Sequence, residues 1–256
     1  MAYQARDSAR FYDLAEDVQY PSVTTILGVI AKPGLMYWAA NVERAAILAA
    51  VGDALSNKKK PKTRAEMLAL IETLAKEKKA ADKIKDKAAD IGNAAHAMVE
   101  YTLRKQLGLK VGARPEMSKE STRCFLSWQK WFKGTGLRPL AAEKMVFCHG
   151  CGIAGTADLI AEKKGKYYVL DWKTGKAIYK ESFLQNIAYQ HCWKTMAGKK
   201  VAGGAVVRLP KEGGDVEVQM TPKKVKYEAF QYAHGLWKWT REIEGMKTGD
   251  APKETH

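Results

Sequence analysis

The chain has 256 residues, of which 46% are hydrophobic, so it is long and apolar enough to build a core. No apolar run approaches the length that spans a bilayer, and the N-terminus lacks the basic-then-apolar pattern of a signal peptide. These features disfavour membrane and secreted classes, and we expect a cytoplasmic protein with no membrane partner.

The charge balance is strongly basic. Lysine and arginine total 43 against 28 acidic residues, which gives a formal net charge of +15. Such an excess favours a polyanionic partner, because each Lys or Arg placed at a phosphate releases condensed counterions. The alternative is a lysine-rich solvated surface with no partner, and we favour the interpretation that the partner is a nucleic acid.

The first half of the chain is predicted to be mainly helical. Residues 10–30 indicate a short extended segment and then a helix, with Ser22 or Thr24 as its N-cap. Lys32-Pro33-Gly34 breaks this run, and a second helix follows. A longer helical pattern then extends from Thr63 to Leu107.

An aromatic stripe marks the next helix. Phe125, Trp128 and Phe132 recur at helical spacing, and the helix is expected to end near Gly134 or Gly136. A stripe of this kind is more typical of a packed core than of a platform for stacking bases.

The second half of the chain changes to β-type patterns. Three runs rich in β-branched and aromatic residues are joined by tight turns, which predicts an antiparallel meander. A helix, two more strands and a long closing helix follow, so the class is α/β or α+β around a mixed sheet. The predicted strands are 141–148, 153–161, 167–173, 202–209 and 216–220, and the predicted helices are 182–197 and 222–244.

The chain has four cysteines, and two of them form a single CxxC, Cys148 and Cys151. A structural zinc site needs four ligands, and no second pair follows at a suitable spacing. Gly150 and Gly152 indicate a hairpin turn at this point. We therefore expect two reduced cysteines beside a turn rather than a metal site.

Two predicted neighbouring strands carry charged residues that can converge. Side chains alternate along a strand, so Asp171 and Lys173 are expected on the same face, with Asp158 one hairpin away. Two carboxylates suit a divalent metal that neutralises the charge growing on a phosphate, and an ammonium can steady the transition state. A surface salt bridge between Asp171 and Lys173 is the alternative, but it leaves Asp158 and the preceding glycine unexplained.

These residues resemble the Asp…(Asp/Glu)-X-Lys pattern of the PD-(D/E)XK nucleases. The similarity is greatest to the RecB-type branch, which includes phage exonucleases and the mitochondrial genome maintenance exonuclease. That branch also carries an upstream Gly…His helix and a Gln-x-x-x-Tyr helix after the lysine strand. Here these correspond to Ile91–His96 and Gln185–Tyr189, and Tyr20–Thr25 looks like phage members of the group. The resemblance covers residues from about 20 to 210.

The resemblance implies a role for each matching residue. An imidazole nitrogen and two carboxylates would hold the metal, the lysine would act on the water or the phosphate, and the glutamine and tyrosine would hold the lysine or the substrate. Outside this context an ordinary helix histidine and ordinary helix polarity would be preferred. The implied metal ligands are His96, Asp158 and Asp171, and the implied catalytic residues are Asp158, Asp171, Lys173, Gln185 and Tyr189.

Two further carboxylates can face the same site. Glu100 follows His96 by one helical turn and Glu143 lies on the first predicted strand, so each can support the metal's ligands or reach the metal through water. The implied cofactor is Mg²⁺ or Mn²⁺. Some RecB-type members hold an iron–sulfur cluster with C-terminal cysteines, but no cysteine follows Cys192, so we expect none.

The resemblance also implies a single nuclease domain over residues 1–256 with a restriction-endonuclease-like core at 91–245. Residues 1–90 would form an N-terminal helical region whose lysine-rich end grips DNA as an arch. A solvated helix with no role explains the same lysines equally well. The residues expected to contact DNA are Lys79, Lys83, Lys87 and Lys176.

The function implied is that of a metal-dependent DNA exonuclease, bacterial or phage-encoded, that acts on single strands or DNA ends in replication, recombination or repair. Replication or recombination proteins of the phage or its host are the expected protein partners. The alternatives are an endonuclease, a double-strand-specific recombination exonuclease of the same superfamily, or a DNA-binding protein with no activity.

Overall fold

The computed structural model of the protein describes residues 3–6, 9–15, 18–56, 61, 63–76 and 80–245. The chain divides into two compact units. The larger combines Met1–Ile30 with Gly92–His256, and the smaller is Ala31–Ile91. Every strand within the described residues belongs to the larger unit, so this unit alone contains the sheets.

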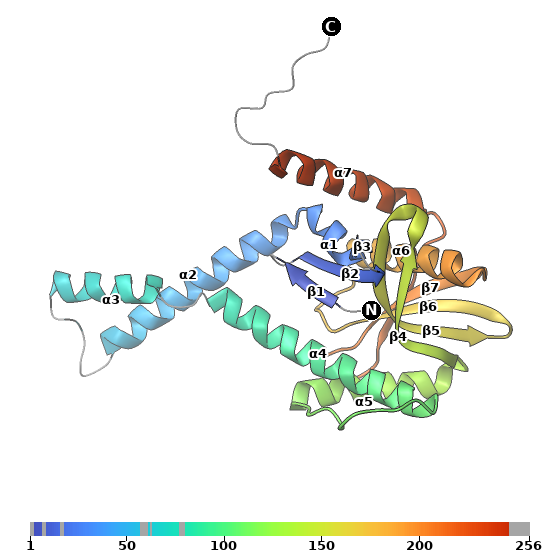
Figure 1. Ribbon diagram of the computed structural model, residues 1–256. Helices are drawn as coiled ribbons and strands as arrows, with labels where there is room; N and C mark the ends of the chain where they lie inside the picture. Colours follow the sequence, from blue (N-terminus) through green and yellow to red (C-terminus); the bar gives the residue numbers. More distant parts are fainter. Residues whose placement is uncertain are drawn as a thin grey trace, which may run out of the picture. The chain divides into compact units, whose positions relative to one another are not determined.

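A five-stranded mixed sheet forms the centre of the larger unit (Figure 1). Its strand order follows the chain, and only the third and fourth strands pair in parallel. The first three form the antiparallel meander that the sequence predicts, so both the meander and the mixed α/β class are confirmed. The strands are β4 (Arg138–Cys148), β5 (Ile153–Lys163), β6 (Lys166–Lys173), β7 (Val201–Arg208) and β8 (Glu217–Met220).

One face of this sheet is covered by α6 (Lys180–Ala197) and α7 (Tyr227–Gly245). Helix α6 connects β6 to β7, and a crossover of this length allows these two strands to run parallel. Ala188 and Cys192 on α6 are fully buried with Ile160 of the sheet and Phe230 of α7. Burial of this apolar face fixes α6 against the strands that carry the charged residues.

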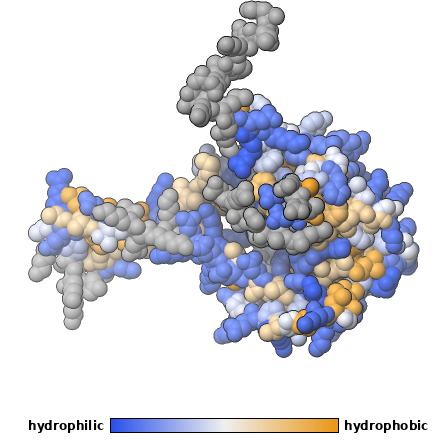
Figure 2. Space-filling model, in the orientation of Figure 1, coloured by the Kyte–Doolittle hydropathy of each residue, from blue (hydrophilic) through white to orange (hydrophobic). Residues whose placement is uncertain are grey.

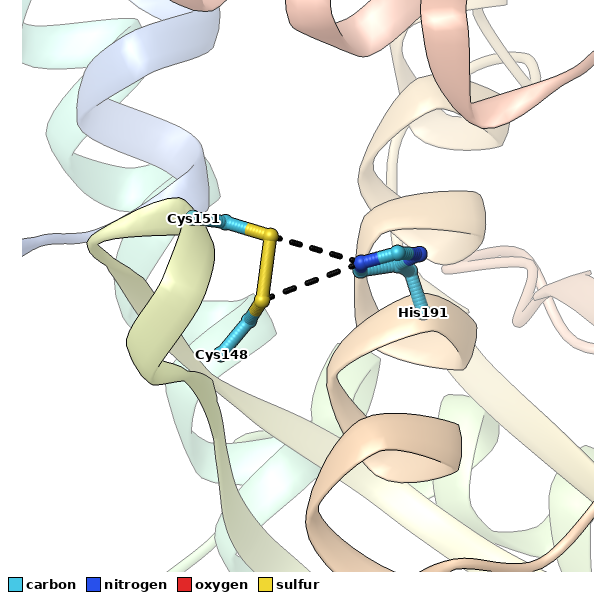
Figure 3. Close-up of side chains that lie close together, drawn as sticks. All are labelled: Cys148, Cys151 and His191. Atoms are coloured by element: carbon cyan, nitrogen blue, oxygen red, sulfur yellow. Dashed lines mark hydrogen bonds between the residues drawn. A yellow bond between two sulfur atoms is a disulfide. The ribbon is translucent and has the colours of Figure 1, made fainter.

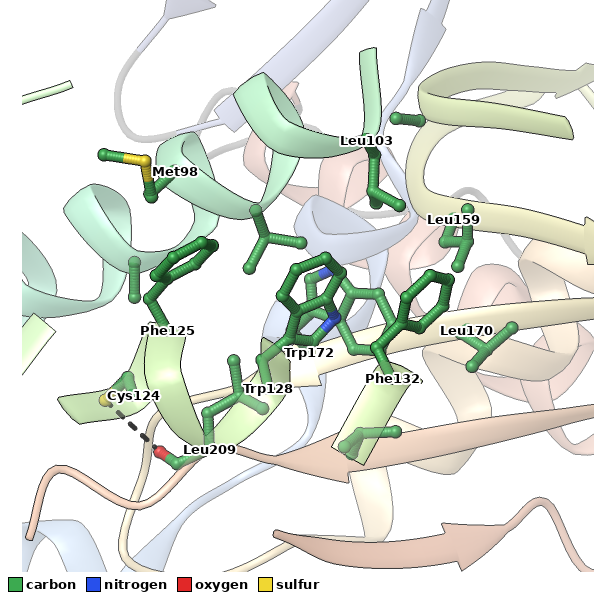
Figure 4. Packing of buried hydrophobic residues seen from close by; sticks show 14 of the residues in the cluster. Met98, Leu103, Cys124, Phe125, Trp128, Phe132, Leu159, Leu170, Trp172 and Leu209 are labelled. Carbon is green, nitrogen blue, oxygen red and sulfur yellow. Dashed lines mark hydrogen bonds between the residues drawn. The ribbon is translucent and has the colours of Figure 1, made fainter. Parts of the chain in front are cut away.

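The opposite face is covered by α5 (Lys119–Thr135) and the later turns of α4 (Ala80–Gln106). Trp128 stacks on Phe132 with ring centroids 5.0 Å apart and meets Trp172 of β6 edge-on at 6.2 Å (Figure 4). The aromatic stripe is buried, as the sequence predicts. Gly136 ends α5 in the left-handed conformation (φ +66°), which glycine adopts without strain.

The N-terminal segment forms a small sheet of its own, made of β1 (Tyr3–Arg6), β2 (Ala9–Ala15) and β3 (Val18–Pro21). Ser22 then caps α1 (Val23–Ile26) by accepting the backbone N–H of Thr25 at 3.0 Å, as predicted, and η1 (Leu27–Val29) follows. The sequence predicted only a short extended segment here. Three strands of four to seven residues are too short to carry a clear alternation, and their pairing with one another stabilises them instead.

The smaller unit is helical and contains α2 (Pro33–Ser56), α3 (Arg64–Lys76) and the first turns of α4. The carboxylate of Glu43 accepts the first backbone N–H groups of α4, those of Ala80 at 3.1 Å and Ala81 at 2.9 Å. Helix starts leave such donors unpaired and favour a negative charge, so Glu43 fixes where α4 begins. No residue of α2 is buried, and hydrophobic residues lie among hydrophilic ones on this surface (Figure 2).

Within the described residues, no single helix has both the length and the apolar character that a membrane crossing requires. The pair formed by Val23–Val29 and Pro33–Ser56 meets both criteria when it is taken together across its bend.

Candidate active site

The two aspartates predicted to converge lie on neighbouring strands. Asp158 on β5 and Asp171 on β6 are next to the paired residues Leu159 and Leu170, and both carboxylates are buried. The backbone N–H of Trp172 donates to Asp158 Oδ2 at 2.6 Å. This bond joins the two strands through the side chain of one aspartate and fixes its orientation beside the other.

Lys173 continues this arrangement at the end of β6. Its Nζ lies 2.6 Å from Asp171 Oδ2 and donates to Gln185 Oε1 at 2.9 Å. Gln185 Nε2 in turn donates to the hydroxyl of Tyr189 at 2.9 Å. Gln185 and Tyr189 stand one turn apart on α6, so a single helix face holds the lysine in place.

His96 and Glu143 approach Asp158 from other elements. His96, on α4, places Nδ1 3.7 Å from Asp158 Oδ2. One ligand atom each from His96, Glu143 and Asp158 lies within 4.8 Å of the other two. Glu143 has a φ of +45°, a backbone conformation that costs free energy for any residue with a Cβ. The packing of β4 therefore holds Glu143 in a strained conformation beside the aspartates.

The carboxylates are crowded enough to change one another's protonation. Burial, together with the charges of Asp158 and Glu100, raises the pKa of Glu143 to about 9. Burial also raises the pKa of Asp171 to about 6, against the opposing effect of Lys173. For Lys173, burial favours the neutral amine, but the charges of Asp171 and Asp158 outweigh it and raise the pKa. Clusters of perturbed groups such as this one are typical of functional sites.

This set of donors fits a divalent cation. An imidazole nitrogen and several carboxylate oxygens meet at one place, and oxygen-rich sets of this kind suit Mg²⁺ and Mn²⁺. A cation would also offset the repulsion from Asp158 and Glu100, which adds to the effect of burial in raising the pKa of Glu143. The Asp171–Lys173 ion pair is present, but Asp171 is buried and Lys173 is partly buried, so the pair is not a surface salt bridge.

Two glycines allow these elements to approach closely. A Cβ on Gly92, near His96 on α4, would come 2.8 Å from Thr174 Oγ1, just beyond the lysine strand. A Cβ on Gly155 would clash with the ring of Tyr189. Glycine is needed at these two motif positions because a neighbouring side chain packs directly against the backbone and leaves no room for a Cβ.

The other predicted residues lie in different places. Glu100 forms an ion pair with Arg104 at 3.2 Å and still lies close enough to influence the pKa of Glu143. Lys176 is exposed on the segment that follows β6. Lys83 and Lys87 are exposed on the part of α4 that belongs to the smaller unit. The prediction for Lys79 falls outside the described residues.

Sequence reasoning missed Asn186, which is fully buried between α6 and the sheet. Its Nδ2 donates to the carbonyl of Val169 at 3.1 Å, and its Oδ1 accepts from Gln190 and Thr221, both at 2.8 Å. A Cβ on Gly204 would collide with this amide. The available signal was the Gly203-Gly204 pair inside a predicted strand, which indicates close approach by another group.

The CxxC turn departs from expectation. The predicted turn is confirmed, since η2 (His149–Cys151) and Gly152 at φ +64° connect β4 to β5. Cys148 and Cys151, however, are joined as a disulfide, so the expectation of two reduced thiols is wrong for this structure. Their Cα atoms are 5.2 Å apart because the turn folds the strand ends together, and that spacing suits a disulfide.

Comparison with known proteins gives one family. Residues 67–255 match the profile described as the PD-(D/E)XK nuclease superfamily. No curated protein sequence is similar enough to count as a relative.

Three solved structures resemble parts of the fold. SSO0001 is 14% identical in sequence and has a TM-score of 0.30, and the match covers 45% of this chain and 56% of the SSO0001 chain. A predicted exonuclease from Eubacterium rectale is 13% identical in sequence and has a TM-score of 0.39, and the match covers 75% of this chain and 78% of the exonuclease chain. The alkaline exonuclease LHK-Exo from Laribacter hongkongensis is 8% identical in sequence and has a TM-score of 0.35, and the match covers 60% of this chain and 87% of the LHK-Exo chain. Likenesses this distant carry no information on substrate.

The close contact at Gly155 gives a prediction. Gly155→Ala should lower the free energy of unfolding by about 1–3 kcal/mol, because the new methyl group displaces the Tyr189 ring. Gly150→Ala is the matched control, since a Cβ there meets nothing within 4 Å, and its effect should stay within about 0.5 kcal/mol. Urea denaturation measures both, and equal stability of the two variants would contradict the contact.

Proposed function

Because this chain belongs to the PD-(D/E)XK nuclease superfamily, we propose that it is a metal-dependent deoxyribonuclease that hydrolyses DNA from its ends. The observation that carries the proposal is the pair of Lys173 and the buried Asp171, 2.6 Å apart, with Asp158 on the adjoining strand. A carboxylate pair beside an ammonium suits metal-dependent phosphodiester hydrolysis, because it can hold the cation and stabilise the charge on the phosphate.

The cofactor proposed is Mg²⁺ or Mn²⁺, held by Asp158 and Asp171 with His96, and with Glu143 close by. When bound, it would neutralise the charge that develops on the phosphate and activate water for attack. The crowding of buried carboxylates supports this assignment, because a divalent cation relieves their mutual repulsion. The imidazole contributes a nitrogen that Mn²⁺ accepts more readily than Mg²⁺ does.

The side chains of this chain have distinct roles in the proposal. Asp158 is held by the Trp172 N–H at Oδ2, so its carboxylate is oriented to face the metal. Lys173 stays charged because Asp171 raises its pKa, and its ammonium would stabilise the negative charge on the scissile phosphate. Gln185 is a positioning residue, since its Oε1 accepts from Lys173 and its amide is held by Tyr189.

The resemblance to RecB-type exonucleases supports the proposed preference for DNA ends or single strands. The net charge of +15 supports a polyanionic substrate. We place the activity in replication, recombination or repair, in the cytoplasm of a bacterium or of a phage-infected host. An endonuclease of the same superfamily is the second candidate, and circular substrates distinguish it because they have no ends.

The site assignment predicts separate effects on chemistry and on binding. Lys173→Ala and Asp171→Ala should each lower the cleavage rate of labelled linear DNA by at least about 100-fold in Mg²⁺, because each removes a charge at the reacting phosphate. Binding of linear DNA in Ca²⁺ should change little, since affinity comes from scattered basic residues. Lys166→Ala, at the opposite end of β6, is the matched control and should cleave like the parent.

The same assay tests the preference for ends. The parent protein should degrade linear single strands and leave circular single strands intact. Cleavage of circles at the linear rate would favour the endonuclease, and normal cleavage by a folded Lys173→Ala variant would contradict the site. Circular dichroism of each variant provides the check on folding, because losing one partner of a buried ion pair destabilises the fold.

We also propose that the lysine-rich start of α4 binds the DNA backbone. Lys83 and Lys87 are exposed and stand one turn apart, so they present two positive charges on one helix face. A pair of this kind suits successive phosphates of a single strand, whereas a solvated helix without a role needs no such alignment.

Charge reversal tests this surface. The Lys83→Glu, Lys87→Glu double variant should bind single-stranded DNA more weakly, with a shallower dependence of log affinity on log salt by about 0.7 per lost phosphate contact. Lys223→Glu with Lys224→Glu is the matched control, because both lysines are exposed and the net charge changes equally. Fluorescence anisotropy over a salt series measures both, and identical slopes for the two double variants would refute the assignment.

A further inference from the structure

A second cluster of metal-ligating side chains lies outside the candidate active site. Cys148 ends β4, Cys151 ends the following turn, and His191 comes from α6, some forty residues later (Figure 3). His191 Nε2 lies 3.7 Å from the sulfur of Cys148 and 3.4 Å from that of Cys151. One donor atom from each residue therefore lies within 4.8 Å of the other two.

The chemistry of this cluster differs from that of the aspartate site. Thiolates are soft ligands that select Zn²⁺ over Mg²⁺, and imidazole suits Zn²⁺ equally well. Sequence reasoning disfavoured a metal here because it found two ligands and no further pair. The fold supplies a third ligand from α6, a residue that no sequence spacing connects to the CxxC turn.

The neighbouring residues fix the orientation of the His191 imidazole. The ring of His191 stacks flat on Tyr227, with centroids 3.7 Å apart and planes within 2° of parallel, and Nε2 faces the sulfurs. The neighbouring His149 is turned elsewhere, since its Nδ1 lies 3.0 Å from the hydroxyl of Tyr20. Partners that fix the orientation of a ligating histidine are a regular feature of metal sites.

We propose that the reduced form of this cluster binds one Zn²⁺ through Cys148, Cys151 and His191, and that the ion ties the β4–β5 turn to α6. Cys151 and His191 are partly exposed, so solvent can supply the fourth ligand. The site would support α6 just beyond Tyr189, on the helix that also carries Gln185.

Formation of this site from the disulfide requires a reductant. A dithiol delivers two electrons and two protons, which convert the disulfide to two thiols, and the dithiol leaves as its own cyclic disulfide. Zn²⁺ then displaces the two thiol protons as it binds the thiolates. The disulfide and the zinc site are therefore alternative states of one turn.

Zinc content measures the proposal directly. Protein reduced with a dithiol under argon, supplied with ZnSO₄ and desalted should retain about one zinc per chain by inductively coupled plasma mass spectrometry. Cys151→Ser and His191→Ala should lose most of this zinc. Cys124→Ser is the matched control, because Cys124 is buried in the other hydrophobic cluster, and it should retain the parent level.

Asp158→Asn distinguishes this site from the aspartate cluster, and it should retain zinc if the ion sits on the thiolates. Co²⁺ provides a readout that does not depend on a variant folding, since the reduced parent should develop a thiolate-to-cobalt charge-transfer band. Zinc lost in Asp158→Asn but kept in Cys151→Ser would overturn the proposal. So would the absence of a thiolate band with Co²⁺, or stoichiometric iron in place of zinc.

Discussion

The ion pair between the partly buried Lys173 and the buried Asp171 constrains the arrangement around it. A charged lysine is stable in this position only because a carboxylate lies 2.6 Å away, and the carboxylate is stable only because the lysine is there. Asp158 adds a second carboxylate beside this pair, and burial together with the charges of Asp158 and Glu100 raises the pKa of the neighbouring Glu143 to about 9. Carboxylates crowded together in this way, with the His96 imidazole beside them, make a place where a divalent cation is favourable.

Helix α6 connects the chemistry to the fold. Asn186 anchors it to the carbonyl of Val169 in the sheet, and one turn of the same helix presents Gln185 and Tyr189 to the lysine. His191 extends this role to the CxxC turn at the end of the β4 strand. A rigid element that carries several supporting contacts keeps a reactive group within the narrow range of positions that catalysis requires.

Local patterns were enough to predict much of this arrangement. The period of two along a strand placed Asp171 and Lys173 on one face, a tight turn brought Asp158 alongside, and a four-residue spacing aligned Gln185 with Tyr189. The mixed sheet followed from the order of strands and helices, because a helical crossover allows a parallel pair.

The features that were missed leave no clear pattern in the sequence. The left-handed φ of Glu143 has no sequence signal, since glutamate does not favour that conformation. The N-terminal sheet is built from strands too short to show a pattern, and His191 meets the cysteines only because α6 packs beside the β4–β5 turn. His191 follows Cys151 by 40 residues, so spacing along the chain cannot reveal this cluster.

Calorimetric titration of Mn²⁺ decides whether the crowded carboxylates form a metal site. The parent protein should bind Mn²⁺ with measurable heat, and Asp158→Asn should lose most of that affinity while retaining a native circular dichroism spectrum. Lys166→Ala should bind like the parent. Equal Mn²⁺ binding by the parent and by Asp158→Asn, or no binding by either, would show that these carboxylates do not form the metal site.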